Sequence, residues 1–101
     1  MHRARTSSRR LRHRYGRARV AGWMTAVVRT PANDRAATRA YMKAKAEKAA
    51  LENAWSRAMS RAAAGSAGDA HYAAELSKKA GEQGAIISAA QHYAQLPKGA
   101  S

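Results

Sequence analysis

Cysteine and phenylalanine are absent from this 101-residue chain, and proline occurs only twice. Without cysteine there is no disulfide framework and no thiolate chemistry, so the redox compartment stays open. The longest uncharged apolar run, VAGWMTAVV over residues 20–28, has nine residues. A membrane-spanning helix takes about 20, so this run does not predict one.

Large apolar side chains are also few. The hydrophobic fraction is 46%, but 27 of these residues are alanine and 19 are larger. Burying a leucine-sized side chain contributes roughly 1.5–3 kcal/mol, whereas ordering each residue costs about 1–2 kcal/mol of backbone entropy. We therefore expect neighbouring chains or nucleic acid to supply further burial, and we do not expect an independent globular domain.

Acidic residues are scarce, with six against 19 lysines and arginines, which gives a net charge of +13. Such a charge predicts an anionic partner: nucleic acid, a phospholipid surface or an acidic protein. The charge falls in steps, from +9 over residues 1–30 to +4 over residues 31–64 and zero over residues 65–101. The chain therefore has a basic head and a neutral tail.

The sequence contains few side chains of the kinds that form active sites. His71 and Glu75 lie one helical turn apart, but two ligands are too few for a zinc site, and a side-chain pair explains them better. No serine lies in a nucleophile-elbow sequence, and the glycines lack phosphate-loop and dinucleotide spacing. The sequence predicts a non-enzymatic protein with no catalytic residue, no metal site, no cofactor and no small-molecule substrate.

The basic head is built from arginine. Residues 1–16 show no apolar periodicity, and we expect them to form a flexible arm that orders on contact with its partner. The arginine fork matches phosphate oxygens, and a tyrosine in the arm can stack on a base or ribose. Because no sequence-reading motif is present, we expect binding to the nucleic-acid backbone without base selectivity, with DNA favoured over RNA. The candidate contacts are Arg3, Arg5, Arg9, Arg10, Arg12, Arg14, Tyr15, Arg17 and Arg19.

The remaining residues, 17–101, predict an all-α body with helices over about 18–29, 31–64 and 70–96. Thr30 and Pro31 suit a helix start, Gly65 is expected to end the long helix, and Pro97 follows the last one. Gly81 and Gly84 leave open whether the last segment splits into two shorter helices. The pattern also leaves open whether the long helices fold back as a hairpin or extend between neighbours.

Both long helices carry apolar seams with alternating four- and three-residue spacing. The side chains predicted to pack are Trp23, Val27, Tyr41, Leu51, Trp55, Leu76 and Ile87. Tyr72 in HYAAEL and Tyr93 in HYAQL lie three heptads apart, and we expect both to pack. Cations gather opposite the first seam, where they form either an anion-binding face or a solvated one. These cations are Arg35, Arg39, Lys43, Arg57 and Arg61.

Together these features predict a structural protein whose arm binds nucleic acid while its helical body packs into a larger assembly, including other copies of itself. A phage virion or DNA-packaging complex is the favoured setting, which implies a virion or cytoplasmic nucleoprotein location; a ribosome or nucleoid is an alternative. Two further alternatives remain. Trp23 with flanking arginines suits a helix on an anionic membrane surface, and the basic face suits a purely protein–protein linker. An acid-free, arginine-rich head is also typical of a transit peptide.

Overall fold

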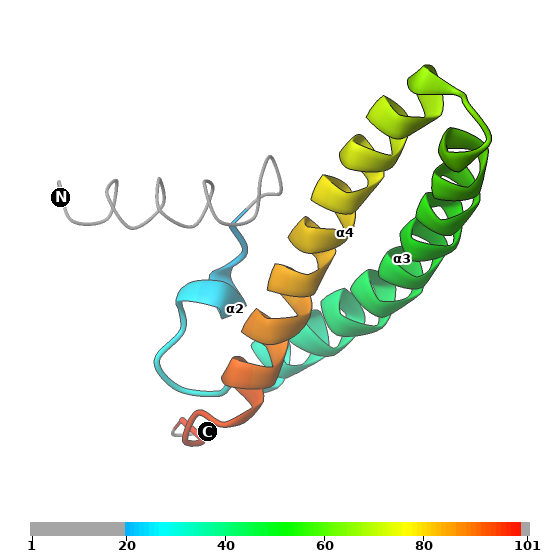
Figure 1. The fold of residues 1–101 in the computed structure, drawn as a ribbon. Coiled ribbons are helices and arrows are strands. Elements are labelled where there is room, and N and C mark those ends of the chain that lie inside the picture. The colour runs from blue at the N-terminus through cyan, green and yellow to red at the C-terminus, as the bar shows by residue number, and fades with distance from the viewer. Residues whose placement is uncertain (1–19, 100–101) are drawn as a thin grey trace, which may run out of the picture.

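The computed structural model describes residues 20–99, which contain three helices: α2 (Gly22–Thr25), α3 (Pro31–Ala63) and α4 (Ala67–Ala94). The two long helices pack against each other as a hairpin, and α2 lies beside its open end (Figure 1). We call this end the base and the α3–α4 turn the tip. The all-α prediction is confirmed, and the hairpin answers the question that the sequence left open.

Local capping explains where the long helices begin and end. Thr30 Oγ1 accepts the Asn33 backbone N–H at 3.2 Å, with Pro31 at the first helical position. At the tip, Gly65 adopts φ 113°, a left-handed conformation that favours glycine. Ser66 Oγ then accepts the Asp69 N–H at 3.4 Å and starts α4.

Helix α4 differs from the prediction at its start and in its middle. It begins at Ala67 rather than near residue 70, because a serine cap lets the helix begin at the next residue and its first turn tolerates Gly68. The helix also runs unbroken through Gly81 and Gly84. Packing against α3 offsets the low helix propensity of these glycines.

The predicted helix over residues 18–29 is wrong for most of its described part. Only Gly22–Thr25 is helical, and Ala26 is already extended with ψ 146°. Arg29 instead forms an isolated parallel bridge with Lys98: the Arg29 N–H donates to the Pro97 carbonyl, and the Gly99 N–H donates to the Arg29 carbonyl, both at 2.8 Å. These tertiary hydrogen bonds hold the segment extended.

The bridge requires a close approach at Gly99. A Cβ atom added there would lie 3.0 Å from Val28 Cγ2 and 3.1 Å from the Arg29 carbonyl oxygen. A larger residue would therefore push the two segments apart. The bridge fixes residues 26–30 against residues 97–99 at the base, so the chain enters and leaves the hairpin at the same end (Figure 1).

Two apolar clusters form the core. The base cluster contains the buried residues Trp23, Ala37, Ala90 and Tyr93, with the Trp23 and Tyr93 rings meeting edge to face at 6.2 Å. The second cluster lies nearer the tip. It contains Ala58, Ala73 and Leu76, with Leu51 and Ala54 packed against them. Alanine at these positions lets the helix backbones approach closely.

Several seam predictions need correction. Val27 is 78% exposed because its segment leaves the helix, and Trp55 is 39% exposed because Ala54, one residue earlier, faces the second cluster. Tyr72 is 49% exposed, whereas Tyr93 is buried. Ile87 is half-buried, and its neighbour Ile86 packs on the base cluster.

Candidate nucleic-acid interface

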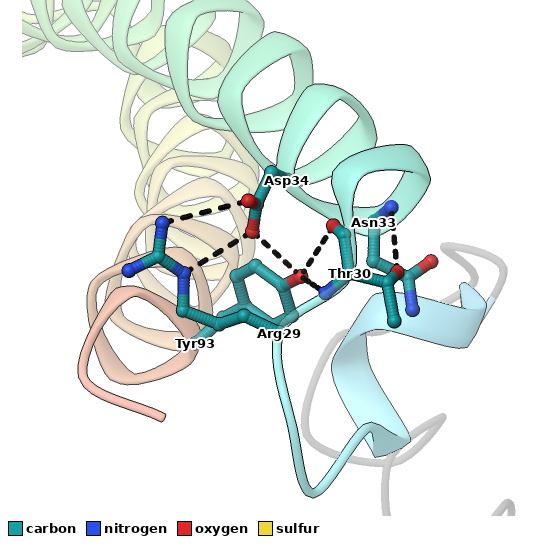
Figure 2. A network of polar contacts seen from close by, with 5 residues as sticks. All are labelled: Arg29, Thr30, Asn33, Asp34 and Tyr93. Carbon is teal, nitrogen blue, oxygen red and sulfur yellow. Dashed lines mark hydrogen bonds and ion pairs between the residues drawn. The ribbon is translucent and has the colours of Figure 1, made fainter. Parts of the chain in front are cut away.

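A polar network joins three segments at the base (Figure 2). Arg29 donates to the Asp34 carboxylate from Nε at 3.2 Å and from Nη2 at 3.5 Å. The Tyr93 hydroxyl lies 2.9 Å from Asp34 Oδ1 and 3.3 Å from the Thr30 carbonyl oxygen. Its single proton goes to the carboxylate, which is nearer and charged. The hydroxyl oxygen in turn accepts the Thr30 N–H at 3.1 Å.

This network lowers the pKa of Asp34 from its ordinary value of 3.8. The largest cause is the hydrogen bond from Arg29, followed by the hydrogen bond from Tyr93; the charges of Arg29 and Lys98 add to the effect. The carboxylate therefore stays ionised and ties the residue 29–30 segment to both long helices. Its role is structural, since every partner that it binds belongs to the fold.

A second ion pair closes the tip. Arg61 Nε donates to Asp69 Oδ1 at 3.1 Å across the turn. The pKa of Asp69 is lowered first by its hydrogen bond with Ser66 and then by that with Arg61. Arg61, predicted as a phosphate contact, therefore already has an anionic partner in its own chain, although its side chain is still 52% exposed.

The other cations of the predicted stripe, Arg35, Arg39, Lys43 and Arg57, are exposed, and no ion pair joins them to any residue from 20 to 99.

The side of the hairpin that Lys43 and Arg57 occupy follows from their spacing, whereas Arg35 and Arg39 lie beside Asp34 and Thr38. Ala36 and Ala40 pack on the base cluster, under α2. Lys43 follows Ala40 by three residues, which keeps it near the same edge of the helix, and Arg57 follows Lys43 by two heptads, a drift of about 40°. We call this edge, together with the matching edge of α4, the α2 side. The chain segment that leads back to residue 20 also lies on it.

The arm itself lies outside the described residues. This applies to Tyr15 and to all eight arginines predicted to contact phosphate between Arg3 and Arg19. Residues 20–99 hold the other 11 basic residues and all six acidic ones, so their net charge is +5 (11 − 6). More than half of the charge of this chain therefore belongs to its first 19 residues.

A groove of about 240 Å³ lies between α3 and α4 on the side opposite α2, near the base. Its lining includes Thr38 and Tyr41 from α3 and Gln91 and Ala94 from α4, with Asp34 and Arg29 at one end. The surface is mostly apolar, and the acid at its end is held by the base network.

The part of the chain that the structure describes contains no group of three His, Asp or Glu side chains that would hold a metal ion. No helix between residues 20 and 99 is long and apolar enough to cross a bilayer. Comparison with family models, with curated proteins and with solved structures gave no match.

Proposed function

We propose that this chain is a non-enzymatic structural protein that binds the nucleic-acid backbone through its arginine arm while its helical hairpin packs into a larger assembly. A virion or DNA-packaging complex is the setting that suits it best. The observation that carries the proposal is the concentration of charge: eight arginines and no acidic residue within residues 1–19, next to residues 20–99, whose net charge is +5. Solubility alone does not need so uneven a distribution.

The hairpin adds to this support. Lys43 and Arg57 continue the edge of α3 that α2 covers, and the arm joins the body through α2. A polyanion that runs along the arm would therefore meet these exposed cations next. The tip cation Arg61 is expected to contribute less, because its Asp69 partner already neutralises it.

The salt dependence of binding tests the proposal. If six to eight arm arginines contact phosphate, log K for duplex DNA should fall against log salt with a slope of roughly −5 to −7. Each Arg→Ala substitution in the arm should reduce the magnitude by about 0.9. A slope near −2 for the intact chain would exclude the arm as the main contact.

Two lysines provide a matched test of the α2 side. Lys43 lies on that side, whereas Lys45 lies over the Tyr41 ring at 5.5 Å on the opposite side. Lys43→Ala should reduce the slope by about 0.9, and Lys45→Ala should leave it unchanged. Equal effects would mean that net charge, and not the position of the cation, governs binding.

The membrane-surface alternative depends on Trp23, which is 3% exposed and packs against Tyr93. A buried tryptophan is not free to insert among lipid headgroups, so this conformation argues against the membrane-surface alternative. Flotation with anionic vesicles, compared with DNA of matched charge, tests the ranking: binding to vesicles alone would reverse it. For the protein-linker alternative, retention of the chain in its native complex after complete nuclease digestion would favour protein contacts.

A further inference from the structure

Two rows of side chains border the groove side of the hairpin, opposite α2. The row on α4 contains small or neutral residues at alternating four- and three-residue spacing: Ser77, Gly81, Gly84, Ser88, Gln91 and Gln95. The row on α3 has the same spacing and larger side chains: Tyr41, Lys45, Lys48, Glu52, Trp55 and Met59. We call the two rows together the open face.

Contacts across the helix pair place both rows on one side. A Cβ atom at Gly84 would lie 3.6 Å from Lys48 Cε, so the lysine stem crosses toward α4 at this level. Nearer the base, Tyr41 and Gln91 line the same groove. Trp55 comes seven residues after Lys48 on α3, and Ser77 comes seven residues before Gly84 on α4. Because the two helices are antiparallel, Trp55 and Ser77 lie at one level, nearer the tip.

The open face has the character of an uncovered interface. Its α4 row has no charged side chain, although the chain carries +13, and the Lys48 and Glu52 charges on α3 pair with each other at 3.4 Å. Trp55 and Met59 are 39% and 43% exposed. At Gly81, no atom would lie within 4 Å of an added Cβ, so this position faces open space. Exposed aromatic and methionine side chains are typical of binding surfaces.

We propose that the open face binds the open face of a second copy of this chain, so that two hairpins form a four-helix bundle. The face is self-complementary: a two-fold axis along the hairpin places α3 of each copy over α4 of the other and preserves the level of every residue. Trp55 of one copy then packs at the Ser77–Gly81 level of the other, and the reverse contact follows from symmetry. Bulky side chains meet small ones, as knobs into holes.

Area and orientation support this occupant. Two helices, each about 10 Å across, in a body whose longest dimension is 58 Å, present enough surface for the roughly 800 Å² that each partner buries in a stable interface. The alternative two-fold, which places α3 over α3, would stack bulky row on bulky row. The favoured arrangement aligns tip with tip and brings both bases to one end.

The dimer proposal depends on the hairpin alone. It names a partner for the helical body, which the proposed function packs into a larger assembly. Residue 20 of each copy would lie at the same end of the dimer, which would allow two arms to bind one polyanion.

Sedimentation equilibrium of the full chain tests the dimer after nuclease treatment, in about 0.5 M salt to screen repulsion between the arms. We expect the dimer to form as the protein concentration is raised to about 100 μM, where even a weak interface is occupied. Gly81→Gln should weaken dimerisation by about 30-fold, since it places a larger side chain at the level where Trp55 of the other copy packs. Gly68→Gln, at another α4 glycine with open space around it, should leave dimerisation unchanged. Both substitutions raise helix propensity, so neither should unfold the monomer.

A second pair of variants tests the bulky row. Trp55→Gln should weaken the dimer by about 30-fold, as for a central tryptophan anchor, whereas Tyr72→Gln, on the α2 side, should not. Spin labels at Ala64→Cys, unique in a cysteine-free chain, should lie far closer together than the 58 Å length of the body. A chain that stays monomeric under these conditions, a dimer insensitive to both Gly81→Gln and Trp55→Gln, or widely separated tips would overturn the proposal. The salt slope of DNA binding is measured separately, so either proposal can fail alone.

Discussion

The base and the tip of the hairpin are built from the same local parts but are held by different forces. Each has a hydroxyl cap, Thr30 or Ser66, and an arginine–aspartate pair. At the base, the Trp23 and Tyr93 rings pack together, and the Asp34 pair is joined to Tyr93, 59 residues away. At the tip the pair spans only the turn, eight residues, over a cluster of alanines and one leucine.

This difference teaches that capping fixes where helices begin, whereas contacts between distant residues fix how they are arranged. The base holds the hairpin, α2 and residues 97–99 in one tertiary arrangement. The tip mainly completes the turn. Variants at corresponding positions in the two regions should therefore differ most where they remove aromatic packing and least where they remove a cap.

The largest expected effect separates the two tryptophans. Trp23→Ala should lower the free energy of unfolding by about 3–5 kcal/mol, because it empties the centre of the base cluster. Trp55→Ala should cost about 1 kcal/mol or less when measured on the monomer, because the side chain is 39% exposed. Urea denaturation followed by far-UV circular dichroism at low protein concentration measures both. Equal losses would contradict the assignment of the core to the base.

The two tyrosines of the HYA sequences give the next comparison. Tyr93→Phe keeps the ring in the cluster but removes the hydroxyl that joins Thr30 to Asp34, so it should cost about 1–2 kcal/mol. Tyr72→Phe should cost less than about 0.5 kcal/mol, since no hydrogen bond joins its hydroxyl to residues 20–99. Thermal unfolding monitored by circular dichroism provides the measurement. A neutral Tyr93→Phe would mean that the network adds nothing to stability.

The caps should cost the same at both ends. Thr30→Ala and Ser66→Ala each remove one side-chain acceptor at a helix N-terminus, which costs about 1 kcal/mol. Thr30→Ser and Ser66→Thr serve as controls because they keep the acceptor. A far larger loss for Thr30→Ala would show that this cap also positions the base network.

Acid should weaken both ends in the same direction. Because the folded-state pKa values of Asp34 and Asp69 are lowered, their contributions are present above the ordinary value of 3.8 and are lost as the pH falls through the folded values. When the pH is lowered below about 4, the Asp34→Asn variant should therefore lose less of its remaining stability than the native chain does. In a Trp55→Phe background, the fluorescence of Trp23 reports on unfolding of the base alone. In this background, Asp69→Asn should change the pH dependence of the Trp23 signal less than Asp34→Asn does.

Local signals in the sequence predict much of this fold. Thr30 and Pro31 start α3 where the sequence predicts, and the hairpin turns at Gly65, whereas α4 begins three residues earlier than predicted because Ser66 caps it. The segment over residues 26–29 could not be predicted in this way. Its apolar spacing fits a helix, but hydrogen bonds to Pro97 and Gly99, about 70 residues away, hold it extended.

The seams show how a heptad pattern loses register. Tyr72 and Tyr93 are 21 residues apart, and a straight α-helix drifts by about 20° per heptad from a strict seven-residue repeat. Over three heptads the drift is about 60°, enough to turn one tyrosine into the core and leave the other outside. The same drift brings Ile86 into the base cluster where the pattern pointed to Ile87.

The candidate interface was accessible to sequence reasoning only in part. The cation stripe follows from helical spacing, but the ion pair of Arg61 depends on the exact path of the turn. The Asp34 network has no local signature, because its tyrosine lies in the other helix. The open face emerges only once α3 and α4 are known to pack antiparallel, since each row alone is an ordinary helix edge.

The bridge between Arg29 and Lys98 has a mechanical consequence. A pull applied between residues 20 and 99 would load the two hydrogen bonds of the bridge together, because the bridged segments are parallel and the force enters them at opposite ends. A pull between residue 20 and the tip would instead be carried along α3, whose own backbone hydrogen bonds would resist it. The direction in which tension reaches this molecule therefore decides how much force it withstands.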